Sequence, residues 1–391
     1  MMDFERLNAS TSAERLAALA KLMSQHESGE LASPISGENV NNHIHTIYSF
    51  SPYSPAMAAY LAWKAGLATA GIMDHDSVGG LREFIEAGRI INLPVTVGFE
   101  CRASFKVTAF EGKRINNPDQ NSVGYLAMHA IPHDKIDVAE DFLAPLRKSR
   151  NMRNRLMTEK LSNIVQTVGI NINFDKDVLP LSQHNDGGSV TERHILFALA
   201  EKIMDAAKPG PGVVKLLKDN FGINPSGSVL EKLNNPESAW YRYYLLAALK
   251  GNLVESFYID ADAELLGYQD FIRLAEVLGA IPAYAYLGDV TDSVTGDKKA
   301  QHFEDAYLDD LVAFLKNAGF KAITYMPSRN TAAQLARLMA LCEKHGLMQI
   351  SGEDINSPFQ PFICEAIEKP EYRHLIASAW ALIEHERKMK P

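Results

Sequence analysis

NVNNHIH at residues 39–45, TAGIMD at 69–74 and PVTVGFE at 94–100 are the three stretches that decide the fold of this 391-residue chain. Each is a short segment that ends in polar or charged residues, and helical patterns at 55–65 and 79–91 lie between them. This alternation predicts βα units around a parallel sheet, with the chemical groups at the C-terminal ends of the strands.

Outside these stretches the pattern changes twice. Residues 12–27 carry the apolar stripe of a surface helix, capped by Thr11 or Ser12, within an N-terminal helical extension over 1–37. Residues 140–270 are mainly helical and are broken by Lys208-Pro209-Gly210-Pro211-Gly212. The remaining predicted elements are helices at 141–168, 191–207, 236–250, 262–278, 304–318, 330–345 and 373–388, and strands at 280–287, 320–326 and 347–351.

The composition limits the kind of partner. Acidic residues outnumber basic residues 48 to 39, which gives a formal net charge of −9 and argues against a nucleic-acid-binding protein. The chain is 46% hydrophobic and 22% charged, as expected of a globular protein with a sizeable core. We therefore expect a small-molecule substrate, with self-association left open.

The cysteines and the N-terminus indicate the compartment. Cys101, Cys342 and Cys364 are too few and too scattered for a disulfide framework, which favours a reducing environment. The first residues contain acids and lack the basic start and apolar core of a signal peptide. Apolar stretches are interrupted before they reach membrane-spanning length, so we expect a cytoplasmic protein without membrane contact.

His43 and His45 are the first candidates for chemistry. Residues two apart on a strand point to the same face, so both imidazoles can reach one metal ion. The alternative is a pair of incidental or structural histidines, since an HxH motif alone is a weak signal.

Two carboxylate-bearing strand ends follow. In Gly71-Ile72-Met73-Asp74-His75-Asp76-Ser77, an imidazole lies between carboxylates that can ligate a metal or orient a ligating histidine. The alternative is an acidic helix cap ahead of Val78-Gly79-Gly80. The strand Val95-Thr96-Val97-Gly98-Phe99 delivers Glu100 at its end, where a bridging ligand or a surface glutamate can sit.

In this order the motifs resemble those of the PHP (polymerase and histidinol phosphatase) family of metal-dependent phosphoesterases. The resemblance is carried by Asn42-His43-Ile44-His45-Thr46-Ile47-Tyr48-Ser49, Met73-Asp74-His75-Asp76 and Gly98-Phe99-Glu100. It covers residues 38–135 well and 270–360 more loosely. It implies an α/β fold: a distorted (βα)7 PHP-type barrel over 38–139 and 271–391, with the mainly helical insertion at 140–270.

The resemblance also implies one or two divalent ions: zinc, manganese or iron. His43, His45, Glu100 and Asp354 match the ligands of the first metal. A second metal would share Glu100 and use His129, with Tyr286 at the position of the family's other histidine. Tyrosinate is a poorer ligand at neutral pH because the reference pKa of tyrosine is near 10.

A third metal site is expected to be absent. Phe50 stands where the family has a metal-ligating residue, and Asn356 replaces the histidine of the last motif. His75 is then released to protonate the leaving oxygen, with Asp74 or Asp76 orienting its ring.

Substrate contacts are expected from cationic and polar residues near strand ends. Thr191-Glu192-Arg193-His194-Ile195 resembles the Arg-x-His segment that contacts substrate in related phosphoesterases, although Thr191 also suits a helix cap. The alternative for such residues is that they are exposed and only solvated. The candidates for binding phosphate by charge-assisted hydrogen bonds are Arg102, Arg193, His194, Lys298, Lys299 and Arg329. Asn356 is a further candidate for contact with the substrate.

The favoured function is a metal-dependent phosphoesterase that attacks a small phosphorylated molecule with metal-activated water. Hydrolysis of an amide or ester on the same scaffold is the first alternative, because a fold does not determine the reaction. The second alternative is a catalytically degenerate protein that only binds a ligand, suggested by Phe50, Tyr286 and Asn356.

Overall fold

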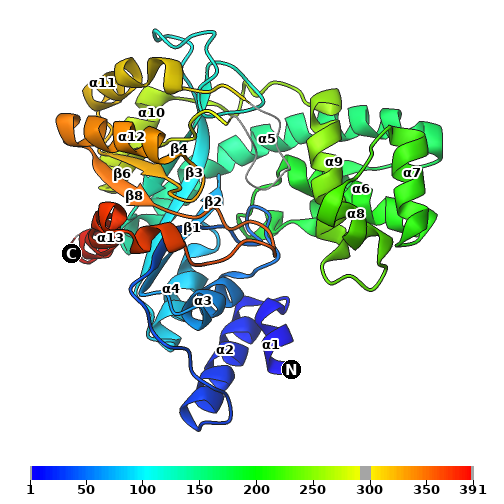
Figure 1. The fold of residues 1–391 in the computed structure, drawn as a ribbon, viewed down its shortest axis with the longest axis horizontal. Helices are drawn as coiled ribbons and strands as arrows, with labels where there is room; N and C mark the ends of the chain where they lie inside the picture. The colour runs from blue at the N-terminus through cyan, green and yellow to red at the C-terminus, as the bar shows by residue number, and fades with distance from the viewer. Residues whose placement is uncertain (1, 291–300, 389–391) are drawn as a thin grey trace.

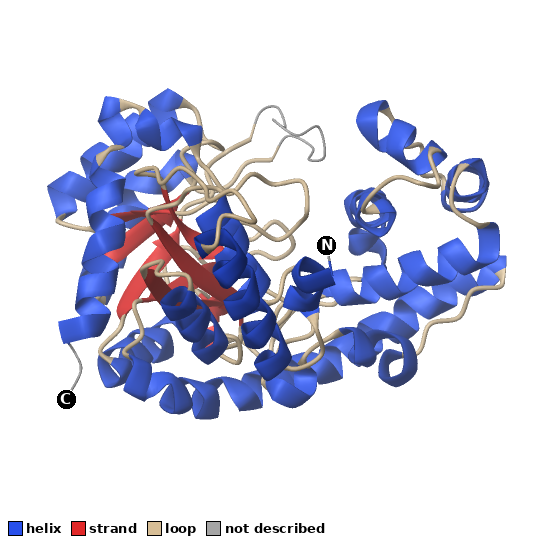
Figure 2. Ribbon diagram, turned by 90° about the horizontal axis from the view of Figure 1, so that it is seen from below, coloured by secondary structure: helices blue, strands red, loops and turns tan. Residues whose placement is uncertain are grey.

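The computed structural model describes residues 2–290 and 301–388. Seven strands in the order β1-β2-β3-β4-β6-β7-β8 form a nearly closed barrel-like sheet, with helices around it and a helical insertion beside it (Figures 1 and 2). This confirms the predicted fold class. The strands are β1 Val40–Ile44, β2 Thr69–His75, β3 Val95–Ser104, β4 Val123–His129, β6 Ile281–Ala285, β7 Ala322–Tyr325 and β8 Met348–Ser351, and the short β5 Leu266–Gly267 pairs with the end of β3.

The barrel is distorted because β4 runs against its neighbours. It pairs antiparallel with both β3 and β6, whereas the other neighbouring pairs on the path are parallel. An antiparallel strand needs no helical crossover, and residues 105–122 accordingly contain no helix. In the β3–β4 register Glu100 faces Ala127 and Phe99 faces Met128. His129, at the end of β4, therefore lies closer to the start of β3 than Glu100 does.

The sheet closes through backbone contacts beside the HxH motif. The His45 amide donates to the Ile355 carbonyl at 2.9 Å, and the Ile355 amide donates to the His43 carbonyl at 3.1 Å. Gly352 permits this approach, because a Cβ atom there would lie 2.5 Å from the Cβ of His43. The segment after β8 is therefore held against the strand that carries both histidines.

Small side chains fill part of the barrel, and α13 (His374–Lys388) packs against them. Ala127, Ala283 and Ala322 form one buried cluster with Leu382 of α13. Glu386 of the same helix accepts hydrogen bonds from the Val97 amide and the Thr96 hydroxyl near the start of β3. This helix thus covers the end of β3 that lies away from Glu100.

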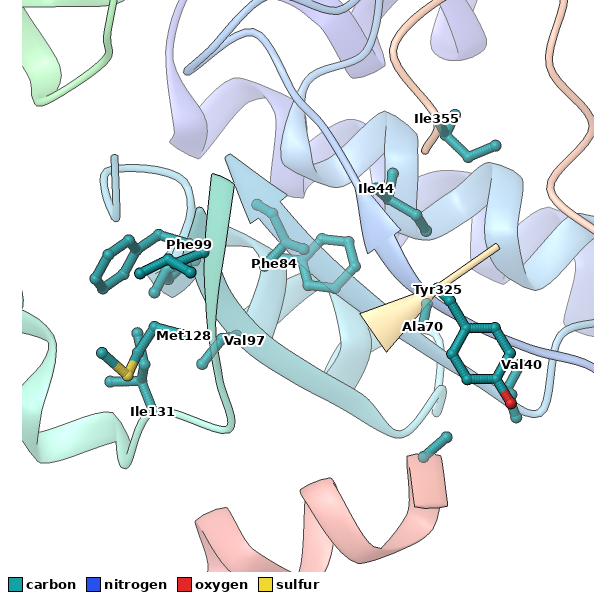
Figure 3. Packing of buried hydrophobic residues seen from close by; sticks show 14 of the residues in the cluster. Val40, Ile44, Ala70, Phe84, Val97, Phe99, Met128, Ile131, Tyr325 and Ile355 are labelled. Atoms are coloured by element: carbon teal, nitrogen blue, oxygen red, sulfur yellow. The ribbon is translucent and has the colours of Figure 1, made fainter. Parts of the chain in front are cut away.

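The outer helices bury a large apolar core against the sheet. They are α3 Pro55–Lys64, α4 Leu81–Ile90, α10 Tyr268–Leu278, α11 Leu308–Ala318 and α12 Ala332–His345. Figure 3 shows part of this core, with Phe84 of α4 beside residues of β1, β2 and β3. The predicted helix at 262–278 begins later than expected because Leu266 and Gly267 pair with β3.

The N-terminal helices, α1 (Met2–Glu5) and α2 (Ser12–Glu27), lie beside α3 and α4 of the same chain. The predicted helix over 12–27 is present, and Thr11 and Glu14 form a reciprocal capping box at its start. Arg15 of α2 forms a buried ion pair with Glu83 of α4, 2.5 Å between Nη2 and Oε2. The N-terminal segment is therefore anchored to its own barrel.

The insertion has a second hydrophobic core. Its helices are α5 Ile136–Val165, α6 Glu192–Ala207, α7 Pro211–Phe221, α8 Gly227–Asn234 and α9 Tyr241–Phe257. Figure 1 shows α6 to α9 in green on the side away from the barrel helices, with α5 labelled beside β3 and β4. The first half of α5 packs into the barrel core through Leu143, and its second half into the insertion core through Leu161. The division at residue 140 falls within this helix and stays a prediction.

The predicted helix at 236–250 begins later, at Tyr241, because Trp240 has a left-handed backbone with φ of 64°. None of the helices in the described ranges combines the length and the apolar character that a membrane crossing requires.

Candidate metal centre

His43 and His45, at the C-terminal end of β1, converge with Glu100. Glu100 lies within β3, because the strand that was expected to end at this residue continues to Ser104, paired with β4. One ligand atom from each of the three residues lies within 4.8 Å of the others. The Nε2 atoms of His43 and His45 lie 3.4 Å and 3.3 Å from Oε1 of Glu100. Ile44, between the histidines, is fully buried in the core, as strand alternation requires.

Two further side chains border this triad. Asp354, after β8, places Oδ1 3.1 Å from Nε2 of His45, and His75, the last residue of β2, places Nδ1 3.0 Å from Oε1 of Glu100. The side chains of Asp354 and His75 are 39% and 27% exposed, whereas that of His45 is 1% exposed. Solvent therefore reaches the cluster from the side of Asp354 and His75.

A hydrogen-bond relay determines which nitrogen of His45 faces the centre. Asp74 is a carboxylate and can only accept, so the Ser49 hydroxyl donates to Oδ1 of Asp74 at 2.6 Å. Ser49 has no second proton, so at 3.2 Å it accepts from Nδ1–H of His45. The neutral His45 ring then presents an unprotonated Nε2 to Glu100 and Asp354.

The residues present fit a divalent cation. Nε2 of His45 is buried and forms no hydrogen bond, although two carboxylates lie beside it. A buried polar atom without a partner is costly, and a metal ion would accept its lone pair. Two imidazoles and two carboxylates are a donor set suited to zinc, iron or manganese.

The protonation of the carboxylates agrees with this assignment. Burial alone would raise the pKa of Glu100, but His75 and His43 beside it hold that pKa well below its usual range. Burial likewise opposes the ionised form of Asp354, and its neighbours, His45 first and then His43 and Arg193, hold its pKa well below the ordinary value. Both groups are therefore ionised at neutral pH, the form in which a carboxylate can bind a cation.

The residues predicted for a second metal, His129 and Tyr286, have different surroundings. His129 is buried, its Nε2 has no hydrogen-bond partner, and burial, followed by the nearby His43, lowers its pKa to about 3. Tyr286 donates its hydroxyl to Oδ1 of Asp305 at 2.6 Å, and burial followed by that bond raises its pKa. No hydrogen bond or ion pair among the described residues joins Tyr286 to His129.

Asp74 and Asp76 have partners other than His75. Asp74 accepts from Ser49 and from the Thr46 amide at 2.7 Å, which holds the segment after β1. Asp76 accepts from Nη1 of Arg150 at 2.5 Å, and its amide donates to the Glu100 carbonyl at 2.7 Å. The Asp74 carboxylate therefore positions the backbone after β1, and the Asp76 carboxylate ties the end of β2 to α5.

Of the predicted substrate contacts, Asn356 lies beside Asp354, and Arg193 lies beside Asn356. Nδ2 of Asn356 donates to Oδ1 of Asp354 at 2.6 Å. Nη1 of Arg193 lies 3.4 Å from the Asn356 carbonyl, and its charge contributes to the low pKa of Asp354. These two residues border the exposed side of the cluster.

Arg102 and His194 are engaged elsewhere. Nη2 of Arg102 is 3.0 Å from Oε1 of Glu264 in a fully buried pair. Nδ1 of His194 accepts from the Thr191 amide at 3.0 Å in the cap of α6, and burial lowers the pKa of His194 to about 3. Arg102 is thus neutralised in the interior, and His194 is a neutral capping residue.

Arg329, another predicted phosphate contact, is bonded to the backbone of a neighbouring loop. Nε of Arg329 donates to the Leu287 carbonyl at 3.2 Å in the loops after β6 and β7. Lys298 and Lys299 lie outside the described residues.

A buried ionic network was missed in the sequence. Glu192 of α6 lies 3.1 Å from Nη2 of Arg150 and 2.9 Å from Nη2 of Arg153, both on α5. Burial would raise the pKa of Glu192, but these arginines and Arg102 hold it well below its usual range. The spacing of Arg147, Arg150 and Arg153 along one helix face was the available signal.

The protein is therefore an α/β barrel that carries a cluster of two histidines and a glutamate able to hold a metal ion. No protein-family profile and no curated protein sequence matches the chain.

Solved structures do match. One is a candidate metal-dependent phosphoesterase from Bifidobacterium adolescentis, with 19% identity, a TM-score of 0.55, and coverage of 89% of this chain and 98% of that one. Another is an amidohydrolase from Chromobacterium violaceum with bound sulfate and no metal, with 18% identity, a TM-score of 0.53, and coverage of 87% and 96%. At these identities the likeness shows the shared barrel fold.

Proposed function

We propose that this protein is a metal-dependent hydrolase of the PHP type that cleaves a small phosphorylated molecule with activated water. The observation that carries the proposal is the Asp74–Ser49–His45 relay, which leaves a buried, unprotonated Nε2 between two carboxylates. A structural histidine would have a hydrogen bond there; a metal ligand needs that lone pair.

The first metal would be held by His43, His45, Glu100 and Asp354, with His129 available to a second ion. When bound, such an ion polarises the phosphoryl oxygen and lowers the pKa of a coordinated water. Burial opposes a charge on His43, but the neighbouring Glu100 stabilises that charge and raises the pKa of the His43 ring. A metal ion that binds His43 would therefore have to displace the proton of this ring.

His75 is the proposed proton donor to the leaving group. Its Nδ1 lies 3.0 Å from Oε1 of Glu100, so Nε2 is the nitrogen left for substrate on the exposed side. Arg193 and Asn356 border the same opening and would contact the phosphoryl group, the guanidinium by charge-assisted hydrogen bonds. The insertion, which supplies Arg193, would select the substrate.

Amide or ester hydrolysis is the second candidate. It is supported by the likeness to the amidohydrolase and by Phe50, which packs in the insertion core instead of at the metal cluster. The same neighbour binds sulfate, an oxyanion with the shape of phosphate, and this supports the phosphoesterase proposal for the present barrel. A cytoplasmic location remains a prediction, supported by three buried cysteines that are all free thiols.

The test is the metal content of protein purified without chelator, followed by parallel assays on phosphoester and amide panels. We expect about one to two equivalents of metal per chain, phosphoester turnover, and loss of both in His43→Ala. Protein that binds no zinc, manganese or iron would contradict metal dependence. Activity confined to amides would establish the second candidate instead.

A further inference from the structure

A cavity of about 420 Å³ lies along one side of α5, apart from the metal centre. Its helical wall consists of residues spaced three and four apart, which share one face of the helix. His184 and Gly188 form the opposite wall. The helical lining residues are Ala144, Arg147, Lys148, Asn151, Met152 and Arg155.

The lining is strongly basic for a chain of net charge −9. Four of its eight residues, Arg147, Lys148, Arg155 and His184, are basic and none is acidic. Arg147 forms an ion pair with Glu140 of the same helix, which lies outside the lining. Lys148 forms no ion pair with any residue in the described ranges. Arg155 pairs with Asp175, but these side chains are 45% and 55% exposed, so the pair is weak and can yield to a ligand.

We propose that this cavity is a second binding site, for a small phosphorylated molecule. Guanidinium groups form paired hydrogen bonds to phosphoryl oxygens, and Lys148 adds a mobile ammonium. The volume is in the range of small-molecule sites. Met152, 56% exposed, offers an apolar surface to the organic part of the ligand.

Both walls of the cavity contact the loop that directly follows His75 at the end of β2. Nη1 of Arg147 donates to the Asp76 carbonyl at 3.0 Å. On the opposite wall, the Ser77 hydroxyl donates to the Gly187 carbonyl at 2.7 Å. Asp76 has a left-handed backbone with φ of 49°, a conformation that depends on such contacts.

A ligand that binds Arg147 therefore competes with the hydrogen bond of this arginine to the Asp76 carbonyl and with its ion pair to Glu140. Occupancy of the cavity changes the freedom of residues 75–78 and couples this site to the metal centre. The binding step is independent of the proposed hydrolysis, and only the effect of the ligand on turnover rests on it.

The test uses the full-length His43→Ala variant after chelator treatment, so that phosphate cannot bind through metal. Inorganic phosphate is titrated calorimetrically into this protein and into versions that also carry Lys148→Glu or, as a matched control, Lys232→Glu on α8. Lys148 and Lys232 are both exposed, so neither change threatens folding. Because the background lacks the proposed catalytic centre, failure of the proposed function leaves this result interpretable.

We expect one phosphate per chain, about tenfold weaker binding in the Lys148→Glu protein than in the Lys232→Glu protein, and weakening with salt. Hydrogen exchange at residues 75–78 should change on phosphate addition in the control and not in the Lys148→Glu protein. Equal affinity in both proteins, or no binding, overturns the site. Binding without any change in exchange overturns the coupling.

Discussion

Ser49 decides the tautomer of His45, because its single proton goes to Asp74 and it must accept from Nδ1 of His45. Nothing in the sequence marks this serine, since its partners are 4 and 25 residues away. In the sequence analysis it was the last residue of the motif from Asn42 to Ser49, and no role was assigned to it.

Replacing Ser49 tests the relay. Ser49→Ala leaves the His45 tautomer unspecified, so we expect metal affinity about 10- to 100-fold lower, the usual effect of losing such a support. The measurement is a competition titration with a metal indicator. Ser49→Thr retains the hydroxyl and serves as the control; equal affinity in the alanine variant would show that the relay does not set metal binding.

Glu304 gives a prediction for stability against pH. It is fully buried, Oε2 has no partner, and burial raises its pKa from 4.5 to about 7. The folded state therefore holds this proton more tightly, so the contribution of Glu304 to stability is full below pH 4.5 and is lost as pH rises through about 7. The loss amounts to about 3 kcal/mol at most.

In Glu304→Gln the side chain stays neutral, so the free energy of unfolding should no longer fall over this pH window. We expect the variant to exceed the parent in stability at pH 8 by about 1–3 kcal/mol, measured by urea unfolding at pH 5 and pH 8. Glu343→Gln, exposed on α12, is the control and should leave the profile unchanged. A parent profile that is flat from pH 5 to 8 would contradict the assignment.

At the scale of elements, Phe50 joins the barrel to the insertion. It follows β1, yet its ring lies edge-on to His194 at 5.0 Å and to Phe197 at 5.5 Å, and it belongs to the insertion core. Its φ of 131° is an unfavourable backbone conformation for a phenylalanine, which the packing must stabilise.

Phe50→Ala should therefore loosen the insertion. We expect a loss of about 3 kcal/mol in the free energy of unfolding, typical of a buried phenylalanine, and faster hydrogen exchange in α6 and α9. Phe359→Ala, 41% exposed, is the comparison and should cost much less. Unchanged exchange in α6 would mean that Phe50 does not anchor this part of the insertion.

Several elements were predictable because their signals are local. The 12–27 stripe and its cap reappear in α2, and the three opening stretches reappear as β1, β2 and β3 with their polar ends at the cluster. The direction of β4 was not predictable, because the same apolar stretch pairs in either direction and only its neighbours in the sheet decide.

At the scale of the whole molecule, the metal cluster is built from segments that are distant in the chain, so metal binding should stabilise the fold. Zinc at a hundredfold excess over its Kd stabilises a protein by about 2.7 kcal/mol, or about 3 °C in Tm for a chain of this length. Differential scanning fluorimetry with zinc and with chelator measures the shift. His45→Ala should show none, and an equal shift in that variant would place the metal elsewhere.

The sequence by itself determined the βα alternation, the helical insertion and the chemical character of the strand ends. These follow from patterns repeated every two residues in strands and every three to four in helices, which depend only on near neighbours. His43, His45 and Glu100 could be identified in this way because strand order brings strand ends together.

Only the tertiary structure decided the partners of the charged and polar groups. Arg102, expected to contact phosphate, pairs with Glu264, which is 162 residues away, and Asp74 holds Ser49 and Thr46 instead of His75. Partner choice depends on which side chains the closed barrel and the insertion bring within about 3 Å in a water-poor interior. No local pattern encodes that distance.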